Sequence, residues 1–152
     1  MTMNTTIRTI EILMIEDSPS DALVAKEALA YAKVLNTLHV VDNGDDAMAF
    51  LRREGKFAGA AQPDMILLDL KLPGKSGQEV LVEIKSDENL KHIPVVILTT
   101  SKNEEDVLKA YNHYASCYIT KPVNFENFSE VVRSIENFWF TVVTLPRQRP
   151  NA

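Results

Sequence analysis

The chain has 152 residues, enough for one domain with a sizeable core and too few for a second separately folded module. Hydrophobic residues make up 45% and charged residues 24%, as in ordinary globular proteins, and no apolar run approaches the roughly 20 residues of a membrane span. The net charge of -5 argues against nucleic acid as a main partner, because binding a phosphate backbone needs clustered Lys and Arg. We therefore expect neither a membrane nor a nucleic acid as partner.

The single cysteine, Cys117, excludes an internal disulfide and disfavours zinc, because there is no second thiol and the three histidines have no ligand spacing. The polar start "MTMNTT" does not have the pattern of a signal peptide. The expected location is the cytoplasm.

Short β-branched apolar segments alternate along the chain with segments of helical periodicity. The predicted strands are residues 10–15, 37–41, 65–70, 94–100 and 116–120. The predicted helices are residues 19–33, 44–54, 76–87, 103–115 and 124–140, with Ser18 and Ser76 placed to cap two of them. Such alternation predicts an α/β fold, a parallel sheet with helices on both faces.

Polar residues follow the predicted strands at their carboxyl ends. Glu16 and Asp17 follow the first strand, Asp69 closes the third, Thr99 lies at the end of the fourth, and Lys121 follows the fifth. Ligands of open parallel sheets gather outside the carboxyl ends of the strands, so these side chains are expected to converge. Asp17 taken alone fits a helix cap equally well, but the five positions together do not read as caps.

Three clustered carboxylates repel one another unless a cation lies among them. Mg²⁺ suits such a site better than Ca²⁺, because it needs only one or two carboxylates, retains waters and accepts a phosphate oxygen. Lys121 can then bind a phosphoryl oxygen as a point charge, and Thr99 can donate its hydroxyl to another. Asp69 is left as the nucleophile.

In these motifs the chain resembles the receiver domains of two-component response regulators, of the single-domain chemotaxis type. The resemblance runs from about residue 10 to 138 and rests on "IEDS", "LLDLKLPGKSG", "IPVVILTTS" and "YITKP", in that order and spacing. It implies a flavodoxin-like doubly wound sheet of five parallel strands in the order 2-1-3-4-5. It also implies a receiver domain over residues 10–138 that follows a flexible start at residues 1–9.

The resemblance further implies a role for each matching residue. Asp69 would accept a phosphoryl group from a histidine kinase, and the chain would catalyse its own phosphorylation and dephosphorylation. Lys121 and Thr99 would bind the phosphoryl oxygens, and Tyr118 would change rotamer as Thr99 moves. Mg²⁺ would be held by Glu16, partly through water, by Asp17, by Asp69 and by the backbone carbonyl of Lys71.

The segment "RREGKFAGAAQPD" reads as a long surface loop, and residues 139–152 form an apolar C-terminal extension. These two features resemble the small response regulators paired with bacterial and cyanobacterial phytochromes. The tail fits a helix or an extended edge strand, and it carries more apolar surface than one terminal helix buries on its own domain. We therefore expect a homodimer, with kinase docking as the alternative use of this surface. The candidate dimer residues are Phe138, Trp139, Phe140 and Val143.

Other classes share parts of this pattern. A haloacid-dehalogenase-type phosphatase needs a second Asp two positions after its nucleophile, where this chain has Lys71. A flavodoxin needs a hydroxyl-rich phosphate loop after the first strand, where this chain has "EDSPSD". The alternative that stays open is a non-phosphorylated pseudo-receiver that acts as a dimerisation or docking module.

Overall fold

The structure is a computed structural model that describes residues 9–30, 35–99, 117–121, 123–124 and 126. Its parallel strands form one five-stranded sheet in the order β2-β1-β3-β4-β5. They are β1 (Ile10–Ile15), β2 (Asn36–Val41), β3 (Met65–Asp69), β4 (Val95–Thr99) and β5 (Cys117–Thr120). The predicted fold class and strand order are confirmed, and the strand bounds agree with the prediction to within one residue.

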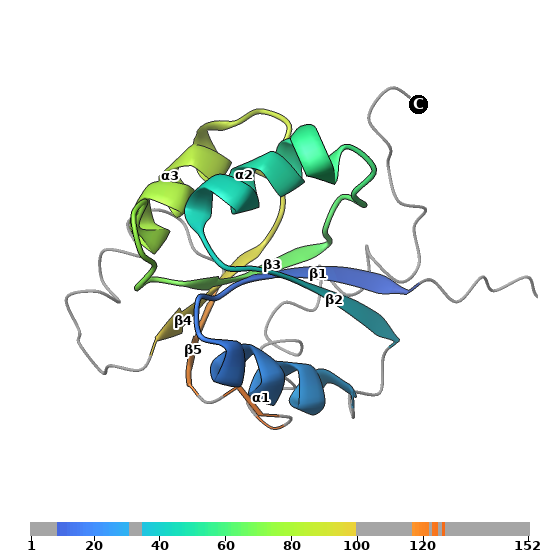
Figure 1. Ribbon diagram of the computed structural model, residues 1–152, viewed down its shortest axis with the longest axis vertical. Coiled ribbons are helices and arrows are strands. Elements are labelled where there is room, and N and C mark those ends of the chain that lie inside the picture. The colour runs from blue at the N-terminus through green and yellow to red at the C-terminus, as the bar shows by residue number, and fades with distance from the viewer. Residues whose placement is uncertain (1–8, 31–34, 100–116, 122, 125, 127–152) are drawn as a thin grey trace, which may run out of the picture.

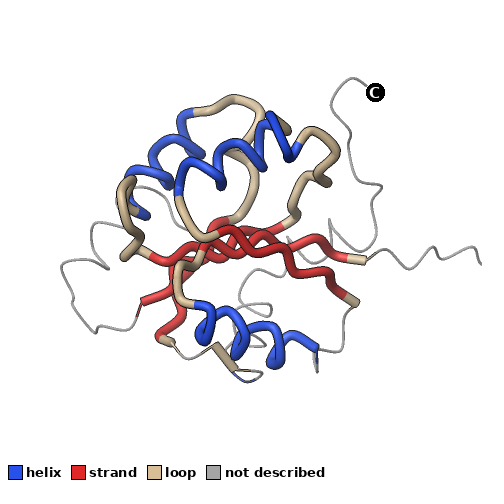
Figure 2. Tube along the Cα trace, in the orientation of Figure 1, coloured by secondary structure: helices blue, strands red, loops and turns tan. Residues whose placement is uncertain are grey.

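Helices cover both faces of the sheet, so the described part of the chain has three layers (Figure 1). The helix α1 (Pro19–Ala30) lies on one face, and α2 (Gly44–Arg52) and α3 (Gly77–Ser86) lie together on the other. Figure 2 shows the strands as the middle layer between them. None of the helices in the described ranges has the length and apolar character needed to cross a membrane.

The central strand β3 is apolar up to its last residue because each of its two sides faces a separate core. In β3, Ile66 and Leu68 join the core under α2 and α3, whereas Met65 and Leu67 join the core under α1. Neighbouring residues of a strand point to opposite faces, so burial on both faces leaves no polar position within the strand. The first polar side chain of β3 is Asp69, at its carboxyl end.

Side-chain caps explain where the helices begin. Ser76 caps α3 through a complete capping box, in which its hydroxyl accepts from the Glu79 N–H and the Glu79 carboxylate accepts from the Ser76 N–H. Ser18 precedes α1 and its hydroxyl accepts from the Asp21 N–H at 3.3 Å, as expected for a cap. The prediction carried α2 two residues too far, because Arg53 adopts a left-handed conformation (φ 57°) that ends the helix.

Part of the segment predicted as a surface loop after α2 packs against the core. It contains a short 3-10 helix, η1 (Gly55–Phe57), and the Phe57 ring packs against Phe50 with ring centroids 5.4 Å apart. A partly buried aromatic thus fastens this connection to the α2–α3 side of the sheet.

Several expectations lie outside the described residues. These are the helices predicted over 103–115 and 124–140, apart from the start of the latter, the flexible start at residues 1–8, and the tail with Phe138, Trp139, Phe140 and Val143.

Gly77 is where α3 comes closest to the carboxyl end of β3. A Cβ at this position would lie 2.3 Å from the backbone oxygen of Asp69 and 2.6 Å from the Cα of Leu70. Neither backbone atom can yield by a change of rotamer. A side chain at residue 77 would therefore push the helix away from the strand that carries Asp69.

We predict that Gly77→Ala lowers the free energy of unfolding by about 1–3 kcal/mol, the usual cost of overpacking. Gly59→Ala is the matched control, because a Cβ there meets nothing within 4 Å. Urea unfolding of both variants checks the prediction. Equal stability of Gly77→Ala and Gly59→Ala would show that the close approach has no energetic consequence.

Candidate functional site

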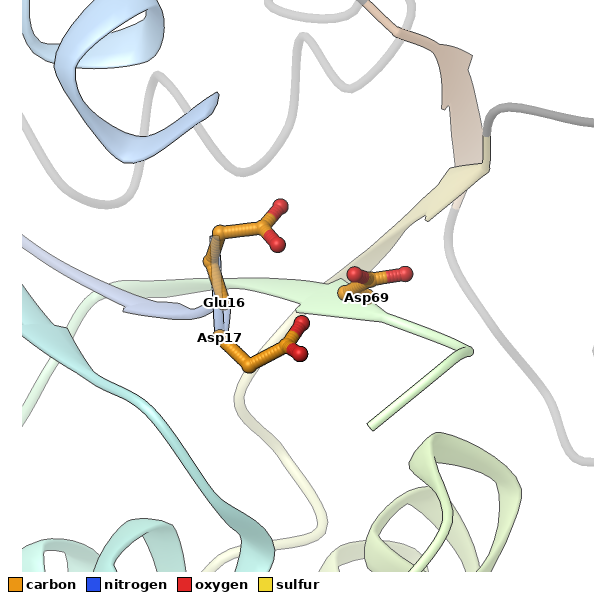
Figure 3. A group of neighbouring side chains, drawn as sticks. All are labelled: Glu16, Asp17 and Asp69. Atoms are coloured by element: carbon orange, nitrogen blue, oxygen red, sulfur yellow. The ribbon is translucent and has the colours of Figure 1, made fainter. Parts of the chain in front are cut away.

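Three carboxylates meet at the carboxyl ends of β1 and β3 (Figure 3). Parallel pairing places Ile15 level with Leu68, so the residues that follow, Glu16 and Asp69, emerge side by side. Glu16, Asp17 and Asp69 each offer a carboxylate oxygen, and these oxygens all lie within 4.8 Å of one another. We call this group the acidic triad.

Lys121 follows β5 and brings a positive charge to the acidic triad. Its ammonium Nζ lies 2.5 Å from Oε1 of Glu16 and 3.1 Å from Oδ2 of Asp69. A third carboxylate, that of Asp21 in the first turn of α1, lies 3.0 Å away. The Lys121 side chain is only 7% exposed, so its charge is stabilised by these carboxylates more than by water.

Burial and the contact between Glu16 and Lys121 have opposite effects on the pKa of each group. Burial alone lowers the pKa of Lys121, but its contacts with the carboxylates of Glu16, Asp21 and Asp69 outweigh burial and raise that pKa above its ordinary value of 10.5. Burial raises the pKa of Glu16 above its ordinary value, although Lys121 and the Ser18 N–H, at 3.1 Å, oppose this. Lys121 is therefore protonated and positively charged, and the buried Glu16 carboxylate depends on this positive charge to stay ionised.

Both oxygens of Asp69 have a defined partner. Oδ2 faces the Lys121 ammonium, and Oδ1 accepts a hydrogen bond of 3.0 Å from the backbone N–H of Lys71. The Asp69 side chain is only 7% exposed, so its carboxylate is buried at the strand end and relies on protein groups more than on water. The Lys121 ammonium and the Lys71 N–H therefore fix the carboxylate of Asp69, the predicted nucleophile.

The remaining predicted site residues are placed by backbone alone or are not described. Thr99 ends β4, one strand over from Asp69, and Tyr118 lies within β5, but the side chains of both fall outside the described part of the structure. Lys71 is exposed and follows Asp69 by two residues. The acidic triad and Lys121 are thus brought together as predicted, and the roles of Thr99, Tyr118 and the Lys71 carbonyl stay predictions.

Sequence reasoning missed Asp21. The contact between Asp21 and Lys121 joins residues 100 positions apart, which no local pattern reveals. The sequence offers only a partial signal, because Asp21 lies in the first turn of the helix that begins three residues after Glu16. That position places Asp21 near the end of β1 but does not indicate its contact with Lys121.

Sequence reasoning also missed a hollow of about 450 Å³ beside the acidic triad. It extends from the end of β1 to the start of α2 and to η1. Its lining includes Asp17, Asp42 and Asp46 together with Val40, Lys56 and Phe57. The segment predicted as a long surface loop therefore forms, through Lys56 and Phe57, one wall of the space next to the acidic triad.

The donor set fits a hard divalent cation. Lys121 is the cation that contacts Glu16 and Asp69 within the described residues, and Asp17 has no hydrogen-bond or ion-pair partner there. The site therefore holds more negative than positive charge, and Asp17, which is exposed, offers its oxygens to solvent. Small hard cations with oxygen ligands and retained waters match this arrangement.

Comparison with known proteins agrees with this geometry. The model of the response regulator receiver domain family matches residues 12–133 of this chain. The response regulator Rcp1 of Synechocystis sp. is 45% identical over 135 residues, which are 89% of this chain and 92% of Rcp1.

Two solved structures are similar over nearly the whole chain. The phosphorylated cyanobacterial phytochrome response regulator RcpA is 47% identical with a TM-score of 0.76, covering 92% of this chain and 100% of that one. The Mn²⁺-bound form of Rcp1 is 44% identical with a TM-score of 0.73, covering 91% of this chain and 99% of that one. The family match, the shared fold and the acidic triad at the strand ends lead to one conclusion: this chain belongs to the response regulator receiver domain family.

Proposed function

We propose that the chain accepts a phosphoryl group on Asp69 from a histidine kinase, in a reaction that depends on Mg²⁺. The observation that carries the proposal is the position of Asp69, which is held between the Lys121 ammonium and the Lys71 N–H beside two further carboxylates. Phosphoryl transfer asks a protein mainly for positioning and for neutralisation of charge. This strand end offers both.

The transfer is a displacement at phosphorus. An oxygen of Asp69 attacks the phosphorus atom of a phosphohistidine, the P–N bond breaks, and the imidazole nitrogen retains the electron pair and takes up a proton. In the later hydrolysis, water attacks phosphorus, the P–O bond to Asp69 breaks, and phosphate and a proton leave. The chain itself would catalyse both steps through the position of its own side chains.

We assign four groups to the metal: the carboxylates of Glu16, Asp17 and Asp69 and the backbone carbonyl of Lys71. When bound, Mg²⁺ supplies positive charge that neutralises the phosphoryl oxygens. Lys121 would bind one phosphoryl oxygen through its ammonium, and Thr99 another through its hydroxyl. Movement of Thr99 toward the phosphoryl group would let Tyr118 change rotamer and so pass the signal to the outer face of β5.

We propose a phytochrome kinase as the source of the phosphoryl group. Support comes from the similarity to RcpA, a cyanobacterial phytochrome response regulator, over nearly the whole chain. A kinase that draws on ATP would place the reaction in the cytoplasm. We further propose that the apolar residues of the tail, Phe138, Trp139, Phe140 and Val143, hold two copies together as a homodimer whose strength responds to phosphorylation.

Acetyl phosphate with Mg²⁺ is predicted to add one phosphoryl group to the wild-type chain and none to Asp69→Asn, because the amide is a poor nucleophile. Intact mass measurement checks this, with EDTA as the control for metal dependence. An undiminished mass increase in Asp69→Asn would place the acceptor elsewhere, and no increase in the wild type would contradict the phosphoacceptor role.

Asp17→Asn is predicted to weaken Mg²⁺ binding by at least about tenfold, since loss even of a group that only orients a ligand costs about ten- to a hundredfold in metal affinity. Titration calorimetry checks this. Asp42→Asn is the matched control, because Asp42 is an exposed carboxylate of the same sheet edge and lies outside the acidic triad. Equal losses in both variants would mean that bulk charge, and not ligation by Asp17, attracts the ion.

Replacing Trp139 and Phe140 together by Glu is predicted to raise the dimer dissociation constant by about thirtyfold or more, the usual effect of removing an aromatic anchor from an interface. Sedimentation velocity measures it. Val82→Glu is the control, because Val82 is an exposed apolar residue of α3. A wild-type chain that sediments as a monomer with and without phosphorylation would refute the role given to the tail.

A further inference from the structure

The ammonium of Lys121 is already enclosed by carboxylates: it donates hydrogen bonds to Asp21 and Asp69 and forms an ion pair with Glu16. A lysine ammonium carries three N–H donors, and this one faces three carboxylates: Glu16 at 2.5 Å, Asp21 at 3.0 Å and Asp69 at 3.1 Å. Any further acceptor that reaches Lys121, such as a phosphoryl oxygen on Asp69, must therefore displace one of the three. Which carboxylate gives way depends on what each loses.

Burial decides which carboxylate gives way. The side chain of Glu16 is fully buried, and within the described residues its Oε1 has no hydrogen-bond partner and is neutralised only by the ion pair with Lys121. Removing the ammonium from Glu16 would leave a buried carboxylate unpaired, which is costly. Asp69 would itself carry the phosphoryl group. Asp21 is 41% exposed, so water replaces the ammonium there at little cost.

A role for Asp21 in helix capping alone does not account for this geometry. Acidic residues are common in the first turn of a helix, where they interact with the positive end of its dipole. Here, however, the Ser18 hydroxyl already accepts from the Asp21 N–H, and the Asp21 carboxylate turns to Lys121. The side chain serves a contact across 100 residues of sequence rather than its own helix.

We propose that Asp21 is a positioning residue that holds the Lys121 ammonium in the unphosphorylated protein and competes with the phosphoryl group for it. The inference rests on the proposed function. Asp21 then sets how tightly the site binds a phosphoryl group, and it is released to solvent when that group arrives. The consequence reaches α1, because a paired carboxylate in its first turn becomes an unpaired one on phosphorylation.

The test uses fluoroberyllate, an anion that mimics a phosphoryl group on a carboxylate, with the full chain and Mg²⁺. Asp21→Asn is expected to bind it about two- to fivefold more tightly than the wild type, the range for loss of one partly exposed ion pair. Asp42→Asn is the control for general charge, since Asp42 is an exposed carboxylate at the same edge of the sheet. Asp42→Asn is expected to leave the affinity unchanged, and Asp21→Glu to restore wild-type affinity.

A second measurement follows Asp21 itself. The ¹³C resonance of its side-chain carboxylate, identified by its absence from Asp21→Asn, is expected to move toward the position of a solvated carboxylate when fluoroberyllate binds. The proposal is overturned if Asp21→Asn binds the anion no better than the wild type, if Asp42→Asn gains as much, or if the Asp21 resonance does not move. A wild-type chain that fails to bind fluoroberyllate with Mg²⁺ would instead contradict the phosphoacceptor function itself.

Discussion

The contact of the Lys121 ammonium with the buried carboxylates of Glu16 and Asp69 is the interaction on which the site depends. It joins the ends of β1, β3 and β5 and places one positive charge where the strand ends would otherwise carry only negative charge. A buried charge is stable only when it is paired, so separating any of these three side chains from the others would cost several kcal/mol, roughly 3–5 kcal/mol for a broken buried pair. Asp17, which is exposed, and Asp21, whose side chain is 41% exposed, are the carboxylates that water can solvate.

The fold prepares this cluster through its register and its close packing. Two separate cores clamp the sheet from both faces, so the strands cannot slip and their carboxyl ends stay level. Gly77 lets the start of α3 pack against the backbone of Asp69 and Leu70. The Lys71 N–H donates a hydrogen bond to Oδ1 of Asp69, the oxygen that does not contact Lys121. Close packing of α3 and the hydrogen bond from the Lys71 N–H thus fix the position of the Asp69 carboxylate.

The sequence predicted the sheet and the acidic triad because both follow from local chemistry: apolar runs must be buried, and polar residues that close those runs collect at one edge. It could not predict the Asp21–Lys121 contact, which depends on the angle at which α1 leaves the sheet. Phe57 was missed for a similar reason, since its ring is anchored by Phe50 on α2 and only the fold makes them neighbours. Local pattern thus located the reacting groups, and three-dimensional packing determined their competing partners.

The central claim is that the strand ends carry more negative charge than Lys121 neutralises and that a divalent cation supplies the balance. A cation that binds only the folded state must stabilise it. The most direct measurement is the thermal unfolding midpoint with increasing Mg²⁺ at constant ionic strength, with no phosphoryl donor present. We expect the midpoint to rise steadily with Mg²⁺, and a midpoint independent of Mg²⁺ would contradict a cation site at the strand ends.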